Sequence, residues 1–305
     1  MTDLSNVAIG TVLPHRSPSP VEVDTITRVA RRAETLGFAD LWVTENVVDQ
    51  AYSFDPIPLL THAAAVTTSI RVGIAVMVLP VRHPIHVAQS CATLDHLSGG
   101  RFTLGVGIGR EHHYREFGVP MTRRVARFKE SIAIMRALWS EPTVTIKGDF
   151  YELDEVTIPL KPVQSPFPVW IGSAHPDAVR RAANIGDGWM GAGSQPRVAF
   201  EQSLKLLHQS LQTNGRDPAD FPVSKRLFMV IDEDSKRARR RLADWFAAVY
   251  GDAALADTAG VFGTQAQVAE QMQAMVDLGV NHLLLNPIDD FDDQLEQLAA
   301  ILKRT

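Results

Sequence analysis

The sequence contains a single cysteine, Cys91, and this scarcity limits the chemistry open to it. One thiol can form neither an intrachain disulfide nor a cluster of thiolate ligands, and a lack of disulfides is typical of proteins from reducing compartments. Cys91 falls on the apolar side of an expected helix, where we predict that it is inert. Because MTDLSNVAIG lacks the basic and apolar regions of a signal peptide, we expect a cytoplasmic protein.

Long apolar runs and a surplus of positive charge are also missing. No apolar run approaches the roughly 20 residues that cross a bilayer, so we expect no membrane partner. The formal net charge is -5, which offers no basic surface for nucleic acid. The arginine-rich stretches 123–124 and 237–241 lie on expected helices beside acidic residues, and we interpret both as solvated helix faces.

Several catalytic signatures are absent. The chain has no HExxH sequence and no HxH at its first expected strand, which disfavours a metal site. It has no GxSxG elbow, which disfavours hydrolysis by a Ser-His-Asp triad. We interpret His83 and His86, together with the isolated His62 and His96, as histidines of helix surfaces or the core. We therefore predict no bound metal.

The most regular stretch that is present runs from Arg71 to Gly109. Residues 72–79 and 101–106 are apolar runs of strand length, and between them His83-Pro84 begins a helix that ends at Ser98-Gly99-Gly100. Both strands are apolar at nearly every position, so both of their faces are covered. This pattern predicts a parallel sheet flanked by helices.

The same alternation continues along the whole chain. A length of 305 residues suits one (β/α)8 TIM barrel of roughly 250 residues with insertions. We therefore predict an α/β fold of one domain, residues 1–305, with a hairpin insertion after strand four at about 141–162 and extra helical segments after strand seven. We expect a polar loop at 111–120, further strands at 7–13, 39–44, 168–171, 187–190, 223–231 and 281–285, and helices at 21–36, 55–69, 123–139, 175–185, 197–213, 234–250, 264–278 and 291–303.

The active sites of such barrels collect at the carboxyl ends of the strands. Two groups of residues at these ends have chemical potential. Gly172-Ser173-Ala174 precedes a helix and suits a phosphate, although glycine after a strand is also common in ordinary turns. Glu111-His112-His113 is the densest cluster of titratable groups and can exchange protons near neutral pH, although a solvated loop would look the same.

The motifs of the chain resemble those of a known family. They are GFADLWVTE at 37–45, LPVRHP at 79–84, TLDHLSGGRFTLGVGIG at 93–109, RRVARFKESIAIMRALW at 123–139, PVWIGS at 168–173 and GDGWM at 186–190. In this order they resemble the bacterial luciferase-like flavin and deazaflavin oxidoreductases. Within that superfamily the chain is most similar to the branch that depends on coenzyme F420.

The resemblance implies a homodimer and a cofactor whose ring lies across the barrel mouth. It implies coenzyme F420, with FMN as the alternative, and a non-prolyl cis peptide between Ala75 and Val76 in strand three. It places Glu45 as an acid near the ring and the stretch Gly172 to Ala174 at the cofactor phosphate. The cofactor-binding residues that it implies are Glu45, Ala75, Val76, Met77, Val78, Gly107, Ile108, Gly109, His113, Gly172, Ser173 and Ala174.

Two positions depart from the family pattern, and a third separates its F420 and FMN branches. Asn46 stands where a histidine is common, and an amide cannot exchange protons at neutral pH. Arg110 precedes Glu111 where the sugar-phosphate dehydrogenases have glutamate directly after the glycine motif. Ile108 stands where the FMN proteins commonly have an arginine that pairs with phosphate, so F420 is favoured.

We therefore predict an F420-dependent oxidoreductase that transfers a hydride between the deazaflavin and a small organic substrate, acting as a reductase. Its predicted catalytic residues are Asn46, which orients, and Glu111 or His112, which supply protons. Two alternatives are an FMN-dependent luciferase-like monooxygenase and a flavin- or deazaflavin-binding protein without turnover.

Overall fold

The computed structural model of the chain describes residue 4 and residues 6–303. Contacts between Cα atoms group the chain into two compact units. The first comprises residues 1–14, 22–42 and 170–305, and the second comprises residues 15–21 and 43–169.

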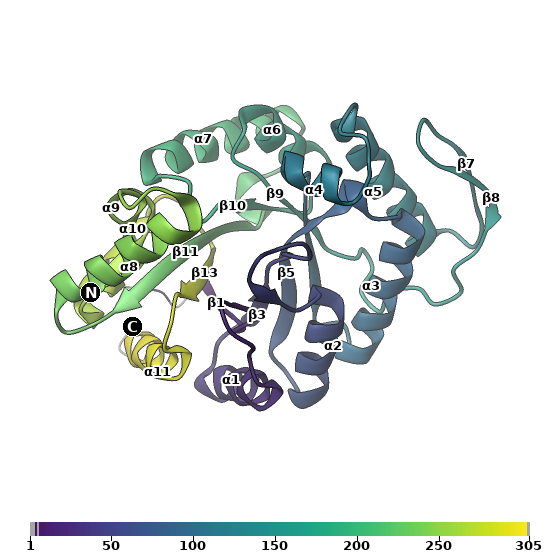
Figure 1. Ribbon diagram of the computed structural model, residues 1–305. Helices are drawn as coiled ribbons and strands as arrows, with labels where there is room; N and C mark the ends of the chain where they lie inside the picture. The colour runs from purple at the N-terminus through teal and green to yellow at the C-terminus, as the bar shows by residue number, and fades with distance from the viewer. Residues whose placement is uncertain (1–3, 5, 304–305) are drawn as a thin grey trace. The chain divides into compact units, whose positions relative to one another are not determined.

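The first unit carries most of the parallel strands (Figure 1). Its elements are β1 (Ala8–Val12), α1 (Val23–Leu36), β3 (Asp40–Val43), β9 (Val169–Gly172), α6 (Pro176–Ile185), β10 (Gly188–Gly191), α7 (Arg197–Thr213), η2 (Pro218–Asp220), β11 (Val223–Ile231), α8 (Ser235–Tyr250), α9 (Leu255–Ala259), β12 (Val261–Gly263), α10 (Gln265–Val276), β13 (His282–Pro287) and α11 (Phe291–Leu302). Parallel pairing joins β9, β10, β11, β13, β1 and β3 in that order, and β12 adds to β11. Helices α8 and α10 gather around β11 and β12 (Figure 1).

The second unit contains two long parallel strands and the helices that follow them. Its elements are β2 (Arg16–Ser17), β4 (Tyr52–Ser53), α2 (Pro56–Val66), β5 (Arg71–Val78), η1 (Leu79–Val81), α3 (Pro84–Ser98), β6 (Phe102–Gly107), α4 (Glu111–Glu116), α5 (Arg124–Ser140), β7 (Val144–Lys147) and β8 (Glu152–Val156). Strand β5 pairs with β6 in parallel, and β2 pairs with β4 antiparallel.

The fold class that the sequence predicts is confirmed. The eight strands β1, β3, β5, β6, β9, β10, β11 and β13, with helices between them, form the closed parallel sheet of a (β/α)8 barrel. The hairpin insertion is confirmed as well, because β7 and β8 are antiparallel. Glu130 of α5 holds the hairpin, since its carboxylate accepts hydrogen bonds from the backbone N–H groups of Asp149, Phe150 and Tyr151 at 2.9–3.0 Å. Helices α8 and α9 are the predicted extra helical segments after strand seven.

Three details of the prediction are wrong. Residues 111–116 form the helix α4 instead of a polar loop; only Tyr114 of this helix is buried, so it has no apolar periodicity to reveal it. Helix α2 ends at Val66, three residues before the predicted end. The short strands β2, β4 and β12 were not expected, because two or three residues are too few to show an alternating pattern.

Helix starts follow from local sequence signals. The Asp55 side chain accepts a hydrogen bond from the Ile57 N–H at 3.1 Å and caps α2. His83 caps α3 and His175 caps α6 in the same way, and in all three helices proline follows the cap, where its missing N–H costs no helical bond. Among the described residues no helix is long and apolar enough to cross a bilayer.

Candidate functional site

Glu45 follows β3 and is a buried carboxylate whose charge is balanced inside the second unit. Its side chain is 3% exposed, accepts a hydrogen bond from the Val78 N–H, and lies 2.6 Å from Nε of Arg82. Arg82 also donates to Asp55 at 3.1 Å. Burial lowers the pKa of Arg82, but the charges of Glu45 and Asp55 offset this and leave the pKa raised. Glu45 is therefore a fixed, buried anchor that ties the end of β5 to the loop after β3.

Strand β5 carries an irregularity directly before that anchor. The peptide bond between Ala75 and Val76 is cis, as the family resemblance implies, and the pairing of β5 with β6 shifts register between Ile74 and Met77. Ala75 and Val76 are the only residues after the first position of β5 that are not buried. The bulge therefore leaves two small or β-branched side chains partly exposed within an otherwise buried stretch of the strand.

The glycine loop after β6 packs closely against this end of β5. Gly109 has φ +68°, and a Cβ there would lie 2.4 Å from Cγ1 of Val78 and 3.3 Å from Nδ1 of His113. The Ile108 carbonyl accepts a hydrogen bond from the Tyr114 hydroxyl at 2.5 Å, which fixes the middle of the loop. The structure therefore brings the loop of Gly107 to Gly109 together with Val78 and His113.

The predicted proton-transfer cluster, Glu111-His112-His113, lies on α4, and its members differ in burial. Glu111 is exposed in the first turn, whereas His112 and His113 are partly buried with ring centroids 4.0 Å apart. The Arg110 N–H lies 3.0 Å from Nδ1 of His113, so we assign Nδ1 as the acceptor and place the proton of the neutral ring on Nε2. Burial, with a smaller contribution from His112, lowers the pKa of His113, so this ring is neutral at pH 7.

Asn46 belongs to a hydrogen-bonded group with Thr44 and His15, neither of which was predicted as a site residue. Its Nδ2 donates to Oγ1 of Thr44 at 2.6 Å, and the same oxygen lies 2.6 Å from Nε2 of His15. His15 precedes Thr44 by 29 positions, so no local pattern connects them.

The predicted phosphate-binding residues lie in the first unit. The Ser173 N–H donates to the Met190 carbonyl at 3.1 Å and is therefore already bonded within the sheet. The Ser173 hydroxyl accepts from the Trp189 indole N–H at 3.0 Å, which leaves its own proton to donate to a ligand. Gly172 and Ser173 are partly exposed and Ala174 is exposed. The hydroxyl of Ser173, rather than its backbone N–H, is the donor that this loop offers.

A buried lysine in the first unit was missed by the sequence analysis. Lys225 of β11 is 1% exposed, and its Nζ donates to the carbonyls of Ala192 and Gln195 at 2.6 and 3.0 Å. Burial lowers the pKa of Lys225 to about 7. The lysine thus holds the loop that follows β10. The signal that could have revealed it was a charged residue, Lys225, within an expected strand that is otherwise largely apolar.

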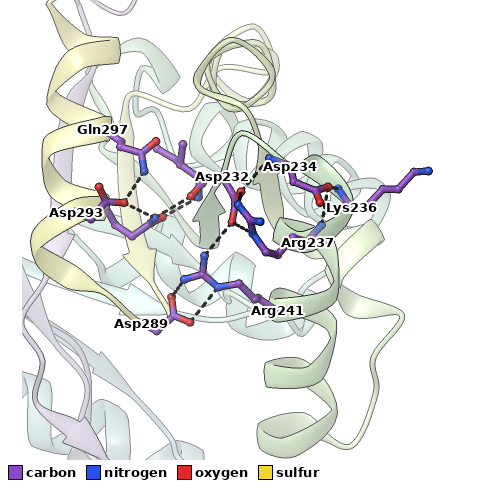
Figure 2. Close-up of polar contacts among 10 residues, drawn as sticks. Asp232, Asp234, Lys236, Arg237, Arg241, Asp289, Asp293 and Gln297 are labelled. Atoms are coloured by element: carbon purple, nitrogen blue, oxygen red, sulfur yellow. Dashed lines mark hydrogen bonds and ion pairs between the residues drawn. The ribbon is translucent and has the colours of Figure 1, made fainter.

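The arginine-rich start of α8 forms an ion-pair cluster with the segment that follows β11. Figure 2 shows Asp232 between Arg237 and Arg241, and Arg241 also reaches Asp289. Hydrogen bonding to Arg237 lowers the pKa of Asp232 to about 2. Arg237 and Arg241 both have carboxylate partners, so neither of them offers an uncompensated charge to an anionic ligand.

The chain is similar to known proteins in both sequence and fold. A family model described as luciferase-like monooxygenase matches residues 7–257. An F420-dependent glucose-6-phosphate dehydrogenase from Beutenbergia cavernae is 32% identical over 224 residues, which cover 70% of this chain and 66% of that protein. Another from Kineococcus radiotolerans is 28% identical over 303 residues, which cover 89% of each chain. The solved structure of an F420-dependent secondary alcohol dehydrogenase with an F420-acetone adduct has a TM-score of 0.85 at 21% identity, covers 97% of this chain and 98% of its own, and shows the shared fold.

Proposed function

We propose, on the premise that the chain belongs to the luciferase-like monooxygenase family, that it is an F420-dependent oxidoreductase. This membership confirms the resemblance in the sequence motifs. The names of the relatives from Beutenbergia cavernae and Kineococcus radiotolerans support coenzyme F420 as the cofactor. The substrate is a small organic molecule, and the chain acts as a reductase of an activated double bond or carbonyl.

The open bulge of β5 is the observation that carries this proposal. A flat ring needs an accessible, rigid and largely apolar support, and the partly exposed Ala75 and Val76 supply one in a strand whose neighbouring residues are buried. Glu45 fixes this support because its carboxylate accepts a hydrogen bond from the Val78 N–H. Ile108 is apolar, so the loop of Gly107 to Gly109 offers no guanidinium for an FMN phosphate. These residues fit a deazaflavin ring.

The residues of the chain then have distinct roles. Coenzyme F420, when bound, supplies the hydride chemistry. Glu45 serves as an anchor and not as a proton carrier, because its charge is balanced by Arg82. The Ser173 hydroxyl donates a hydrogen bond to the cofactor phosphate. His113 contributes a neutral ring with Nε2–H as a donor, while the exposed Glu111 and the adjacent His112 are the proposed source of protons.

Turnover of purified protein with a substrate panel tests this function. Reduced F420 is mixed with ketones, aldehydes and activated alkenes, oxidised F420 is mixed with alcohols, and the absorbance of the oxidised cofactor is followed. We expect substrate-dependent oxidation of reduced F420. Substrate turnover that occurs with reduced FMN and oxygen, but not with F420, would instead assign a monooxygenase. Cofactor binding with no turnover in either direction would assign a non-catalytic protein.

Two variants test the proposed proton donors. Glu111→Gln and His112→Ala are compared with the wild type at saturating substrate. At least one should lower kcat by roughly 10²-fold or more, as expected for general acid–base catalysis. If both stay within a few-fold of the wild type, neither residue donates the proton.

The family resemblance also supports a homodimer as part of this proposal, and the single cysteine supports a cytoplasmic location. Light scattering on the purified protein measures the mass directly. A mass near twice 33.5 kDa supports the dimer, and a mass of 33.5 kDa contradicts it.

A further inference from the structure

Three side chains of the second unit, His15, Thr44 and Asn46, form a continuous hydrogen-bonded chain. The Thr44 backbone N–H donates to Nε2 of His15 at 3.0 Å, and the Thr44 hydroxyl lies 2.6 Å from the same nitrogen. Nδ2 of Asn46 lies 2.6 Å from that hydroxyl. His15 is 6% exposed, and Thr44 and Asn46 are partly buried, so these bonds are sheltered from water.

Only one assignment of the protons satisfies this chain when the imidazole is neutral. Nε2 of His15 accepts from a backbone N–H, so it carries no proton of its own. The Thr44 hydroxyl therefore donates to Nε2, and its oxygen is left to accept. The group of Asn46 that faces Thr44 must then be the amide N–H, as observed. This arrangement leaves Oδ1 of Asn46 directed away from Thr44.

We propose that His15 is a positioning residue which, through Thr44, fixes the carboxamide of Asn46 so that its Oδ1 accepts a hydrogen bond from an O–H or N–H group of the substrate or of its reduced product. This inference rests on the proposed oxidoreductase function. It replaces the missing imidazole at position 46 with an oriented acceptor. For a carbonyl and alcohol pair, only the alcohol form carries the O–H group that such an acceptor binds.

Variants of Thr44 separate this role from simple packing. Thr44→Val removes the hydroxyl and keeps the shape, whereas Thr44→Ser keeps the hydroxyl. His15→Phe removes the acceptor at the far end of the chain. Thr61→Val is the matched control, because the Thr61 hydroxyl donates only to the Ile57 carbonyl within α2, at 2.8 Å.

Two readouts are measured on each protein. The first is the solvent exchange of the Asn46 side-chain amide in the cofactor-free protein, followed by NMR after selective ¹⁵N labelling of asparagine. The second is kcat and KM with oxidised F420 and the best alcohol of the panel, since the alcohol carries the O–H group that Oδ1 would accept from. Thr44→Val and His15→Phe should exchange this amide faster and lower kcat/KM by roughly 3- to 10-fold, the value of one net hydrogen bond. Thr44→Ser and Thr61→Val should match the wild type.

Two results would overturn the proposal. Unchanged amide exchange and turnover in both Thr44→Val and His15→Phe would show that the chain does not hold Asn46. Equal impairment of Thr44→Ser and Thr44→Val would show that packing, and not the hydroxyl, matters. If the wild type has no F420 turnover, the proposed function fails, whereas the amide exchange of the cofactor-free protein still decides whether His15 and Thr44 position Asn46.

Discussion

Replacing Lys225 by methionine should change how the stability of the protein depends on pH. Methionine has a similar length and no charge, so Lys225→Met removes a buried amine without leaving a large cavity. In the wild type, burial lowers the pKa of this amine from 10.5 to about 7. The unfolded chain therefore binds one more proton than the folded chain between these two pH values.

This difference fixes both the sign and the size of the effect. Stability rises with pH wherever the unfolded state binds more protons, so the penalty for burying Lys225 is complete below pH 7 and disappears as the pH rises toward 10.5. Between pH 7 and pH 9 the wild type should gain roughly 2 kcal/mol of unfolding free energy from this one group. The Lys225→Met variant lacks this gain. The two carbonyls of Ala192 and Gln195 lose their donor in the variant, which costs a further amount that does not vary with pH.

Urea unfolding of both proteins at pH 7, 8 and 9 measures the effect. We expect the free energy of the wild type minus that of the variant to increase by roughly 2 kcal/mol across this range. Lys205→Met is the control, because the Lys205 side chain is 70% exposed and its removal should give no comparable trend. A constant difference between wild type and Lys225→Met would refute the reasoning, since it would mean that the amine keeps an ordinary pKa.

Three further predictions follow from buried or paired groups. Gly10→Ala should lower the unfolding free energy by about 3 kcal/mol, because its Cβ would lie 1.7 Å from Oδ1 of buried Asp40; an unchanged urea midpoint would contradict this packing. Asp232→Asn should cost roughly 1 kcal/mol at pH 5, since Arg237 is largely exposed, and this cost should vanish as the pH falls below 4 toward the pKa of about 2; a cost that persists at pH 2 would argue against the pair. Burial raises the pKa of the Cys91 thiol, so a thiol reagent should modify it only on unfolding, and rapid labelling of the folded protein would be inconsistent with its burial.

Elements with a strong apolar period could be predicted from the sequence. Helix α7 and strand β11 have the predicted bounds, because their buried residues recur at the spacing of a helix or run continuously as in a covered strand. Helix α4 could not be predicted in this way. With Tyr114 as its one buried residue, it is stabilised by bonds at its ends and not by an apolar face.

From the residues alone, candidate site positions could be located only where a residue follows a strand directly, whereas the cis peptide inside β5 came from the family resemblance. Glu45, Asn46 and the glycine loop could be located because strand ends are visible in the sequence. Their partners could not, since Arg82 lies 37 positions from Glu45 and Thr44 lies 29 positions from His15. Hydrogen bonds of this kind are set by how strands align in the sheet, which no local pattern encodes.

Cofactor binding to the purified protein tests the central claim most directly. The cofactor-free protein is titrated with F420 and with FMN at low and moderate salt, with fluorescence as the readout. We predict micromolar or tighter binding of F420 and markedly weaker binding of FMN, because Ile108 cannot pair with a phosphate. Micromolar FMN binding with no detectable F420 binding would contradict the assignment and favour a flavin-dependent monooxygenase.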